Sequence, residues 1–132
     1  MNFPTHSLSL LYSLVPGQFS VCRLPPDAPI PQWALRSPFV SVTRTADELS
    51  VVCPAANVPD GVQAVGPSVC FKLKGPFPLT QTGVLASFIQ PLAAAGIAVF
   101  CVATFDTDYV LIAEEFAGAA MEALRSAGHE LE

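Results

Sequence analysis

Residues 97–113 read IAVFCVATFDTDYVLIA, so two apolar runs, 97–103 and 109–113, flank a polar stretch with two aspartates and two threonines. Asp and Thr are common in turns because their side chains bond to the nearby backbone. The pattern predicts a β-hairpin with strands over residues 97–105 and 109–113. Because the first run is apolar on both faces, we expect both faces to be covered, by the rest of the chain or by a second copy of it.

The segments around this hairpin have clear periodicities. Residues 69–73 (VCFKL) alternate as a half-exposed strand does. Apolar residues recur at helical spacing over 84–92, ahead of Gly96, and over 117–127, ahead of Gly128. Leu131 is placed in a last short strand. The predicted order is strand, helix, strand, strand, helix, strand.

The first half reads as an irregular copy of this order, because five prolines fall within residues 25–38 and leave room for one helical turn. We expect an α+β, ferredoxin-like βαββαβ fold in tandem, with residues 1–66 and 67–132 as two halves that share a sheet. The segments expected in the first half are strands at 8–14 and 19–24 joined by a turn at Pro16 and Gly17, a helical turn at 32–35, a hairpin of 39–43 and 49–53, a helical turn at 55–61 and a strand at 62–65.

Composition excludes several classes of function. The net charge is −5 with only six Lys and Arg in 132 residues, which argues against nucleic acid and against acidic membrane surfaces. No apolar run reaches the roughly 18–20 residues of a membrane span. Residues 8–15 are too short for a span, and no basic residue precedes them as in a signal peptide. We therefore expect a soluble, cytoplasmic protein that does not bind membranes.

Sequence patterns for a catalytic or metal site are missing. Cys22, Cys53, Cys70 and Cys101 are widely spaced among apolar residues, which predicts reduced and mostly buried thiols rather than a zinc site. His6 and His129 lie near the two ends, with no nucleophile at a supporting spacing, and are expected at the surface. We predict no enzyme activity, no metal and no cofactor.

Two polar segments together outline a site for an amino acid. Residues 78–83 (PLTQTG) open a helix, whose free N–H groups favour a carboxylate. Asp106 and Asp108 in the hairpin turn favour an ammonium group. Two alternatives stay open: Thr82 or Thr80 acts only as a helix cap, or the aspartates are only turn formers.

The order of elements resembles that of an ACT domain, a small module through which metabolic proteins sense amino acids. Three segments carry the closer resemblance: residues 74–86 (KGPFPLTQTGVLA), 91–97 (PLAAAGI) and 103–111 (ATFDTDYVL). They resemble stand-alone bacterial tandem-ACT proteins related to the regulatory modules of aspartate kinase and to the cytosolic arginine sensor. The resemblance is close over residues 74–115 and weak before Val69.

The resemblance implies a ligand between the start of the first helix and the turn after the second strand. It implies carboxylate contacts near Thr82, Gly83 and Val84. On the turn side it implies contacts from Thr104, Phe105, Thr107 and Asp108. Asp108 is the implied partner of an ammonium or guanidinium group.

The function predicted is therefore an amino-acid-binding regulatory module without catalysis, assembled as a homodimer. One alternative is a structural or protein-interaction module that has kept the fold and lost the ligand. Another is a regulatory fragment whose amino-acid kinase domain lies on a separate chain.

Overall fold

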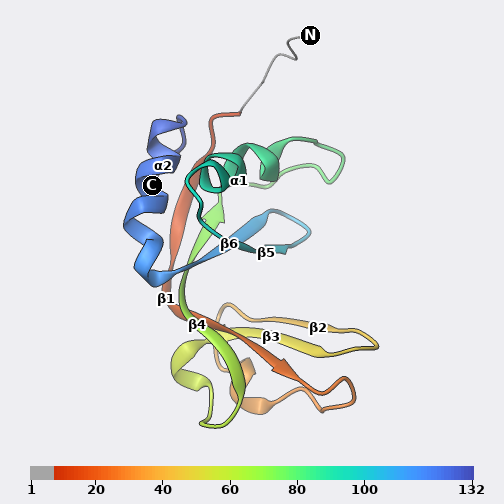
Figure 1. The fold of residues 1–132 in the computed structure, drawn as a ribbon. Coiled ribbons are helices and arrows are strands. Elements are labelled where there is room, and N and C mark those ends of the chain that lie inside the picture. Colours follow the sequence, from red (N-terminus) through yellow and green to blue (C-terminus); the bar gives the residue numbers. More distant parts are fainter. Residues whose placement is uncertain (1–7) are drawn as a thin grey trace.

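The computed structural model describes residues 8–132, which form one largely antiparallel sheet with two α-helices (Figure 1). The fold class is α+β and ferredoxin-like, as predicted. The α-helices are α1 (Val84–Ala94) and α2 (Ala117–Ser126). The strands are β1 (Leu11–Leu24), β2 (Ser41–Arg44), β3 (Leu49–Pro54), β4 (Gln63–Leu73), β5 (Phe100–Ala103), β6 (Asp108–Ala113) and β7 (Glu130–Leu131). Short 3-10 turns lie at Gln32–Leu35, Ala55–Asn57 and Glu114–Phe116.

Two long strands connect the halves of the molecule. The strand order is β2-β3-β1-β4-β6-β5, and β7 pairs in parallel with the start of β1. The central strands β1 and β4 pair with each other along most of their length. In Figure 1 they run from the helices at the top to the β2–β3 hairpin at the bottom. Each half therefore builds its part of the sheet on the same two strands.

The predicted turn at Pro16 and Gly17 is wrong, because both predicted strands around it belong to the single strand β1. The register between β1 and β4 shifts between Val15 and Phe19, so the extra residues form a bulge. Gly17 takes a positive φ of 102° there, and proline has no N–H to lose from the ladder. A Pro-Gly pair fits a bulge as well as a turn, and here the long pairing with β4 decides.

β4 likewise joins two segments that the sequence suggested as separate strands, 62–65 and 69–73. Gly66 lies in β4 at a point where β1 leaves no room for a side chain. A Cβ atom at this position would be 2.6 Å from the Ser20 Oγ and 2.9 Å from the Phe19 carbonyl oxygen. Residues 66 and 67, the expected boundary between the halves, are thus in the interior of a strand.

Both α-helices cover the same face of the sheet in the second half (Figure 1). Their apolar sides meet β1, β4 and β6 in one core. Tyr12, Phe71 and Phe88 form its aromatic centre, with Tyr12 edge-on to both phenylalanines at centroid distances of 5.2 Å. The helical periodicities read from the sequence are thereby confirmed, and so is the short last strand at Leu131.

The first half has 3-10 turns where the second has helices. The turn Gln32–Leu35 and the hairpin β2–β3 confirm the predictions for these segments. A small core fills this half, built from Cys22, Ala34, Leu49, Val51 and Cys53. The prolines of residues 25–38 explain the missing helix, because each removes a backbone donor.

The strand predicted over residues 97–105 is shorter in the structure. β5 covers only Phe100–Ala103, and among the described strands it pairs with β6 alone. The rest of the chain does not cover both faces of β5, because Phe100 is 39% exposed and Cys101 and Ala103 are exposed as well. Cover by a second copy of the chain stays a prediction. The first half gives partial cover: Val102 packs against a cluster that includes Val52 and Phe19.

The buried residues correct two further predictions. Cys22, Cys53 and Cys70 are buried free thiols as expected, but Cys101 is exposed on the edge strand β5. Burial raises the pKa of the Cys53 and Cys70 thiols to about 12.

His129 is buried rather than at the surface. Its Nδ1 accepts a hydrogen bond from the Leu10 N–H at 3.1 Å, and its Nε2 donates to the Ser87 carbonyl at 2.8 Å. The ring thus links the segment before β1, helix α1 and the C-terminal residues. His6 lies outside the described residues.

Within residues 8–132, no helix is both long and apolar enough to cross a membrane.

Candidate functional site

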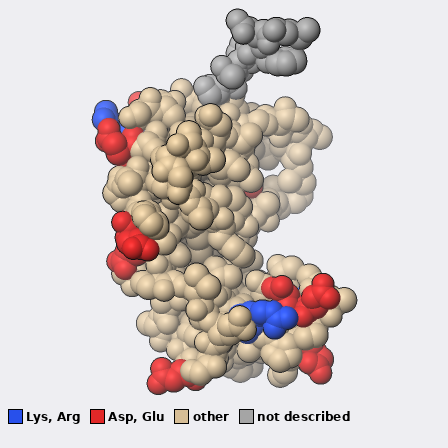
Figure 2. All heavy atoms as spheres, in the orientation of Figure 1, with Lys and Arg blue, Asp and Glu red and all other residues tan. Residues whose placement is uncertain are grey.

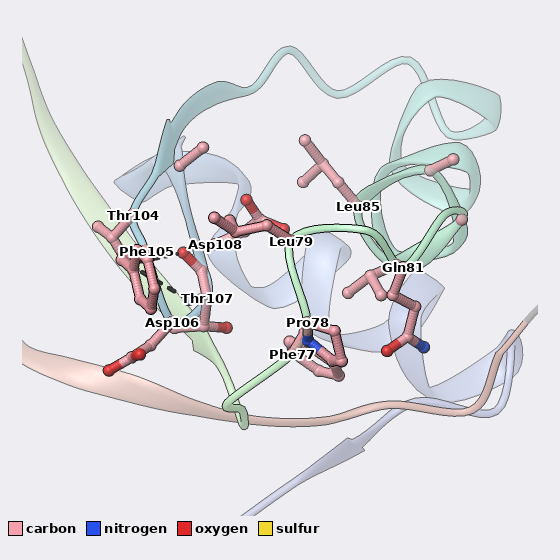
Figure 3. Close-up of a pocket in the computed structure, with 14 residues that line it drawn as sticks. Phe77, Pro78, Leu79, Gln81, Leu85, Thr104, Phe105, Asp106, Thr107 and Asp108 are labelled. Atoms are coloured by element: carbon pink, nitrogen blue, oxygen red, sulfur yellow. Dashed lines mark hydrogen bonds between the residues drawn. The ribbon is translucent and has the colours of Figure 1, made fainter.

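A pocket of about 260 Å³ lies between the segment that leads into α1 and the β5–β6 turn (Figure 3). One wall comes from residues 77–86 and the other from residues 103–108. The two walls are far apart in sequence. Figure 3 shows Phe77, Pro78 and Leu79 on one side, across from Thr104, Phe105 and Asp108 on the other.

Hydrogen bonds from the two threonines fix the turn. The Thr104 N–H and the Thr104 hydroxyl both donate to the Thr107 carbonyl, at 2.9 and 2.8 Å. The Thr107 N–H donates in return to the Thr104 hydroxyl at 3.3 Å. The buried Thr107 hydroxyl donates to the Leu73 carbonyl of β4 at 2.8 Å. Both hydroxyls are therefore committed to holding the turn in place on the sheet.

The opposite wall is tied to the same turn. The Phe77 N–H donates to the Asp106 carbonyl at 2.8 Å. Gly75 permits this approach, because a Cβ atom there would lie 2.8 Å from that same carbonyl oxygen. The loop before α1 is thus held against the turn, and the spacing between the walls is fixed.

α1 begins at the pocket without a side-chain cap. Its N-cap is Gly83, with a φ of 85°, and no side chain of the described residues caps it. The first helical bond is from the Ser87 N–H to the Gly83 carbonyl at 3.0 Å, so the N–H groups of the first turn have no partner inside the helix. The alternative that Thr82 or Thr80 caps the helix is wrong, because the left-handed Gly83 takes that position.

Asp108 is one of the two carboxylates in the lining of the pocket, and Asp106 is the other. Asp108 is half-buried at the start of β6, and burial raises the pKa of its carboxyl above the ordinary value. Among residues 8–132 the ion pairs are Lys74–Glu132 and Glu122–Arg125, so Asp108 takes part in none. Its carboxylate and the positive end of the α1 dipole line the same cavity.

The structure brings together six of the seven residues predicted for the site. Gly83 and Val84 line the pocket from the helix start, and Thr104, Phe105, Thr107 and Asp108 line it from the turn. Thr82 is exposed and does not line it. Pro78, Leu79 and Gln81 also line the pocket and lie in the predicted segment 78–83, and Asp106 lies in the predicted turn. Sequence reasoning missed the rest of the lining: Phe77, Leu85, Ala86 and Ala103.

The first half contains a similar turn, in which a leucine takes the position of Asp108. The Thr45 N–H donates to the Glu48 carbonyl at 2.9 Å, as Thr104 does to Thr107. Leu49 follows in β3 and pairs with Arg44, as Asp108 pairs with Ala103. Leu49 is fully buried in the core of its own half. An apolar side chain thus occupies the position that corresponds to Asp108.

Solved structures of other proteins resemble this chain over most of its length. Protein Atu0741 from Agobacterium tumefaciens is 38% identical in its crystal structure, with a TM-score of 0.90, over 95% of this chain and 93% of that one. A Vibrio cholerae protein of unknown function, described as a possible transport protein, is 21% identical with a TM-score of 0.74 over 91% of each chain.

The same fold occurs in the ligand-free regulatory subunit of aspartate kinase from Thermus thermophilus. That chain is 14% identical with a TM-score of 0.59, over 88% of this chain and 96% of its own. No curated protein matches this chain.

Two family models match the sequence. One, described as an N-terminal domain, matches residues 17–61, and the model of the ACT domain matches residues 66–126. The second match spans the helices, the β5–β6 turn and both walls of the pocket. With this match and the strand–helix–strand–strand–helix–strand order of its second half, the chain belongs to the ACT-domain family.

Proposed function

We propose that this protein is a regulatory module without catalytic activity that binds a free amino acid in the pocket between α1 and the β5–β6 turn. The observation that carries the proposal is the pairing of two opposite polarities in one cavity. The uncapped start of α1 favours the α-carboxylate, and Asp108 favours the α-ammonium group. A zwitterion offers both charges on one carbon atom.

The lining supports binding rather than catalysis. The Thr104 and Thr107 hydroxyls are bonded within the turn or to β4. Asp108 is the half-buried carboxylate of the pocket, and among the described residues its lining contains no histidine, cysteine or lysine to act as its partner in proton transfer. The charged groups suit a bound zwitterion.

The test is a calorimetric titration of the twenty amino acids against the wild type and Asp108→Ala. We expect one chemical group of amino acids to bind the wild type. The variant should lose roughly 1.5–3 kcal/mol of binding free energy, the range for a hydrogen bond to a charged group. It should still fold, because a half-exposed carboxylate without an ion pair adds little to stability.

Asp47→Ala is the matched control, since Asp47 lies in the similar turn of the first half and is exposed. This variant should bind as the wild type does. Equal affinity of the wild type and Asp108→Ala would place the amino acid elsewhere on the molecule.

A second candidate function is protein interaction without a small ligand. The observation that favours it is the exposed edge strand β5, which leaves backbone groups open to pairing with another chain. If none of the twenty amino acids binds, this second function takes precedence.

A further inference from the structure

We propose that the amino acid bound in this pocket has an uncharged, apolar side chain of the size of leucine, isoleucine, methionine or phenylalanine. The inference rests on the proposed function and assigns the ligand class of the same site. It follows from what remains of the pocket once the two charged ends of the ligand are placed.

Large apolar side chains stand on both walls of the pocket beyond the two charged ends. Leu79 and Phe105 lie on opposite walls and are 71% and 79% exposed, although both are large apolar side chains. Phe77 and Leu85 continue this surface. An apolar ligand side chain between these walls would remove part of this area from water, which favours binding in proportion to the area covered.

The charges of the pocket disfavour an acidic side chain. Among the described residues, those that line the cavity include no lysine, arginine or histidine. The start of α1 is the one positive pole, and the α-carboxylate of the ligand uses it. A second carboxylate on the ligand would have no cationic partner and would face Asp108, which repels it.

A basic side chain is disfavoured as well. Its cation would need a second carboxylate aimed into the pocket, because Asp108 already holds the α-ammonium group. Asp106 is the other acidic residue of the lining, but its side chain points away from the loop that leads to α1 (Figure 3). Figure 2 shows the same pattern from outside: there is little charge over the region of α1 and β5, and the charged residues gather along the left edge and on the lower half of the view.

Small polar side chains gain little in this pocket. The Thr104 hydroxyl bonds within the turn and the Thr107 hydroxyl bonds to β4, so neither is free for a ligand. Gln81 is exposed and offers the remaining side-chain amide. Serine or asparagine would exchange water for few new bonds, whereas leucine loses only unfavourable contact with water.

The experiment compares four ligands on the wild type by calorimetry: leucine, alanine, glutamate and arginine. Leucine should bind at least tenfold more tightly than alanine, the scale that extra methylene groups reach in an apolar pocket. Glutamate and arginine should bind more weakly than leucine. In the double variant Leu79→Ala and Phe105→Ala, leucine should lose about tenfold in affinity while alanine changes less than twofold.

Phe116→Ala is the matched control, because Phe116 is also an exposed phenylalanine, at 46%, and does not line the pocket. It should bind leucine as the wild type does. If arginine or glutamate binds most tightly and Asp108→Ala weakens that binding, the assignment of the side-chain class is overturned and the proposed function stands. A wild type that binds none of the amino acids would overturn both.

Discussion

The ionisation of the Asp108 carboxyl and the binding of the proposed ligand depend on each other. Burial raises the pKa of this carboxyl in the ligand-free protein, and an ammonium group beside it would lower the pKa again. Binding then releases a proton in the interval between the two pKa values. The affinity is therefore coupled to pH through one residue.

We expect binding to weaken as the pH falls from 7 through the raised pKa of Asp108, by at most about tenfold per pH unit for a single group. Titrations at several pH values measure this slope. Asp108→Asn should bind weakly at every pH and show no such slope. A wild-type affinity independent of pH between 7 and 4 would contradict the role of Asp108.

The stability of the ligand-free protein changes with pH in the direction opposite to that of the affinity. The folded state binds the Asp108 proton more tightly than the unfolded state does, so this group stabilises the fold as the pH falls through its raised pKa and costs stability at neutral pH. Asp108→Asn is therefore compatible with full stability at pH 7. A loss of binding in this variant would then reflect a lost contact with the ligand and not a loss of the fold.

His129 shows why single residues are the hardest to predict from sequence. A histidine three residues from the end of the chain looks like a surface residue. It is buried because the return of the chain after α2 brings it between Leu10 and Ser87, whose backbone groups it bonds. No local pattern carries this information, since its partners are 119 and 42 residues away.

At the scale of elements, the close approach of β1 and β4 depends on Gly66. Gly17 is a matched comparison, because it also has a positive φ but a Cβ atom there would meet nothing within 4 Å. Gly17→Ala should cost about 1–2 kcal/mol of unfolding free energy through backbone strain alone. Gly66→Ala should cost more, by about 1–3 kcal/mol, because the new methyl group meets the Phe19 carbonyl.

Urea denaturation of the two variants measures this difference. Equal costs would show that the strands separate freely at this point and that their contact is not tight.

The elements that sequence predicted well are those with local signals. α1 and α2 follow from their helical spacing, and the hairpins follow from apolar runs around polar turns. β1 and β4 were each divided in two, because Pro16 with Gly17 and Gly66 with Pro67 have the composition of turns. They are continuous strands because they pair with segments far away in the sequence. The local sequence pattern gives no information about such pairing.

The candidate site was predictable from sequence as two segments and not as a cavity. The helix start and the turn were both identified, and the structure places them on facing walls. The apolar character of the lining was missed because Phe77 and Leu79 lie in a loop without periodicity, where Phe77 is partly buried and Leu79 is exposed. They become part of a pocket only when the Phe77 N–H bonds to Asp106 across the chain.

At the scale of the whole molecule, we expect the protein to form a homodimer. β5 leaves one edge of the sheet unpaired among the described residues, and Phe100 is partly exposed on it. Symmetric dimers are the commonest assembly for such a surface. Sedimentation should show a dimer at micromolar concentration, and Phe100→Asp should weaken it.

Val65→Asp is the control for this change, because Val65 is 75% exposed on β4 away from β5. It should leave the dimer intact. A wild type that sediments as a monomer would show that the partial cover from the first half is enough for β5.

The shared strands have a consequence for how the chain opens. Because β1 and β4 run through both halves, neither half can unravel while the other keeps its sheet, and the amides of the chain should exchange with solvent in one cooperative event. A ligand held only by the second half therefore slows exchange in the first. At a concentration one hundred times its Kd, it would add about 2.7 kcal/mol to the protection of β3, far from the pocket. A half that holds no ligand of its own would thus report the occupancy of its neighbour.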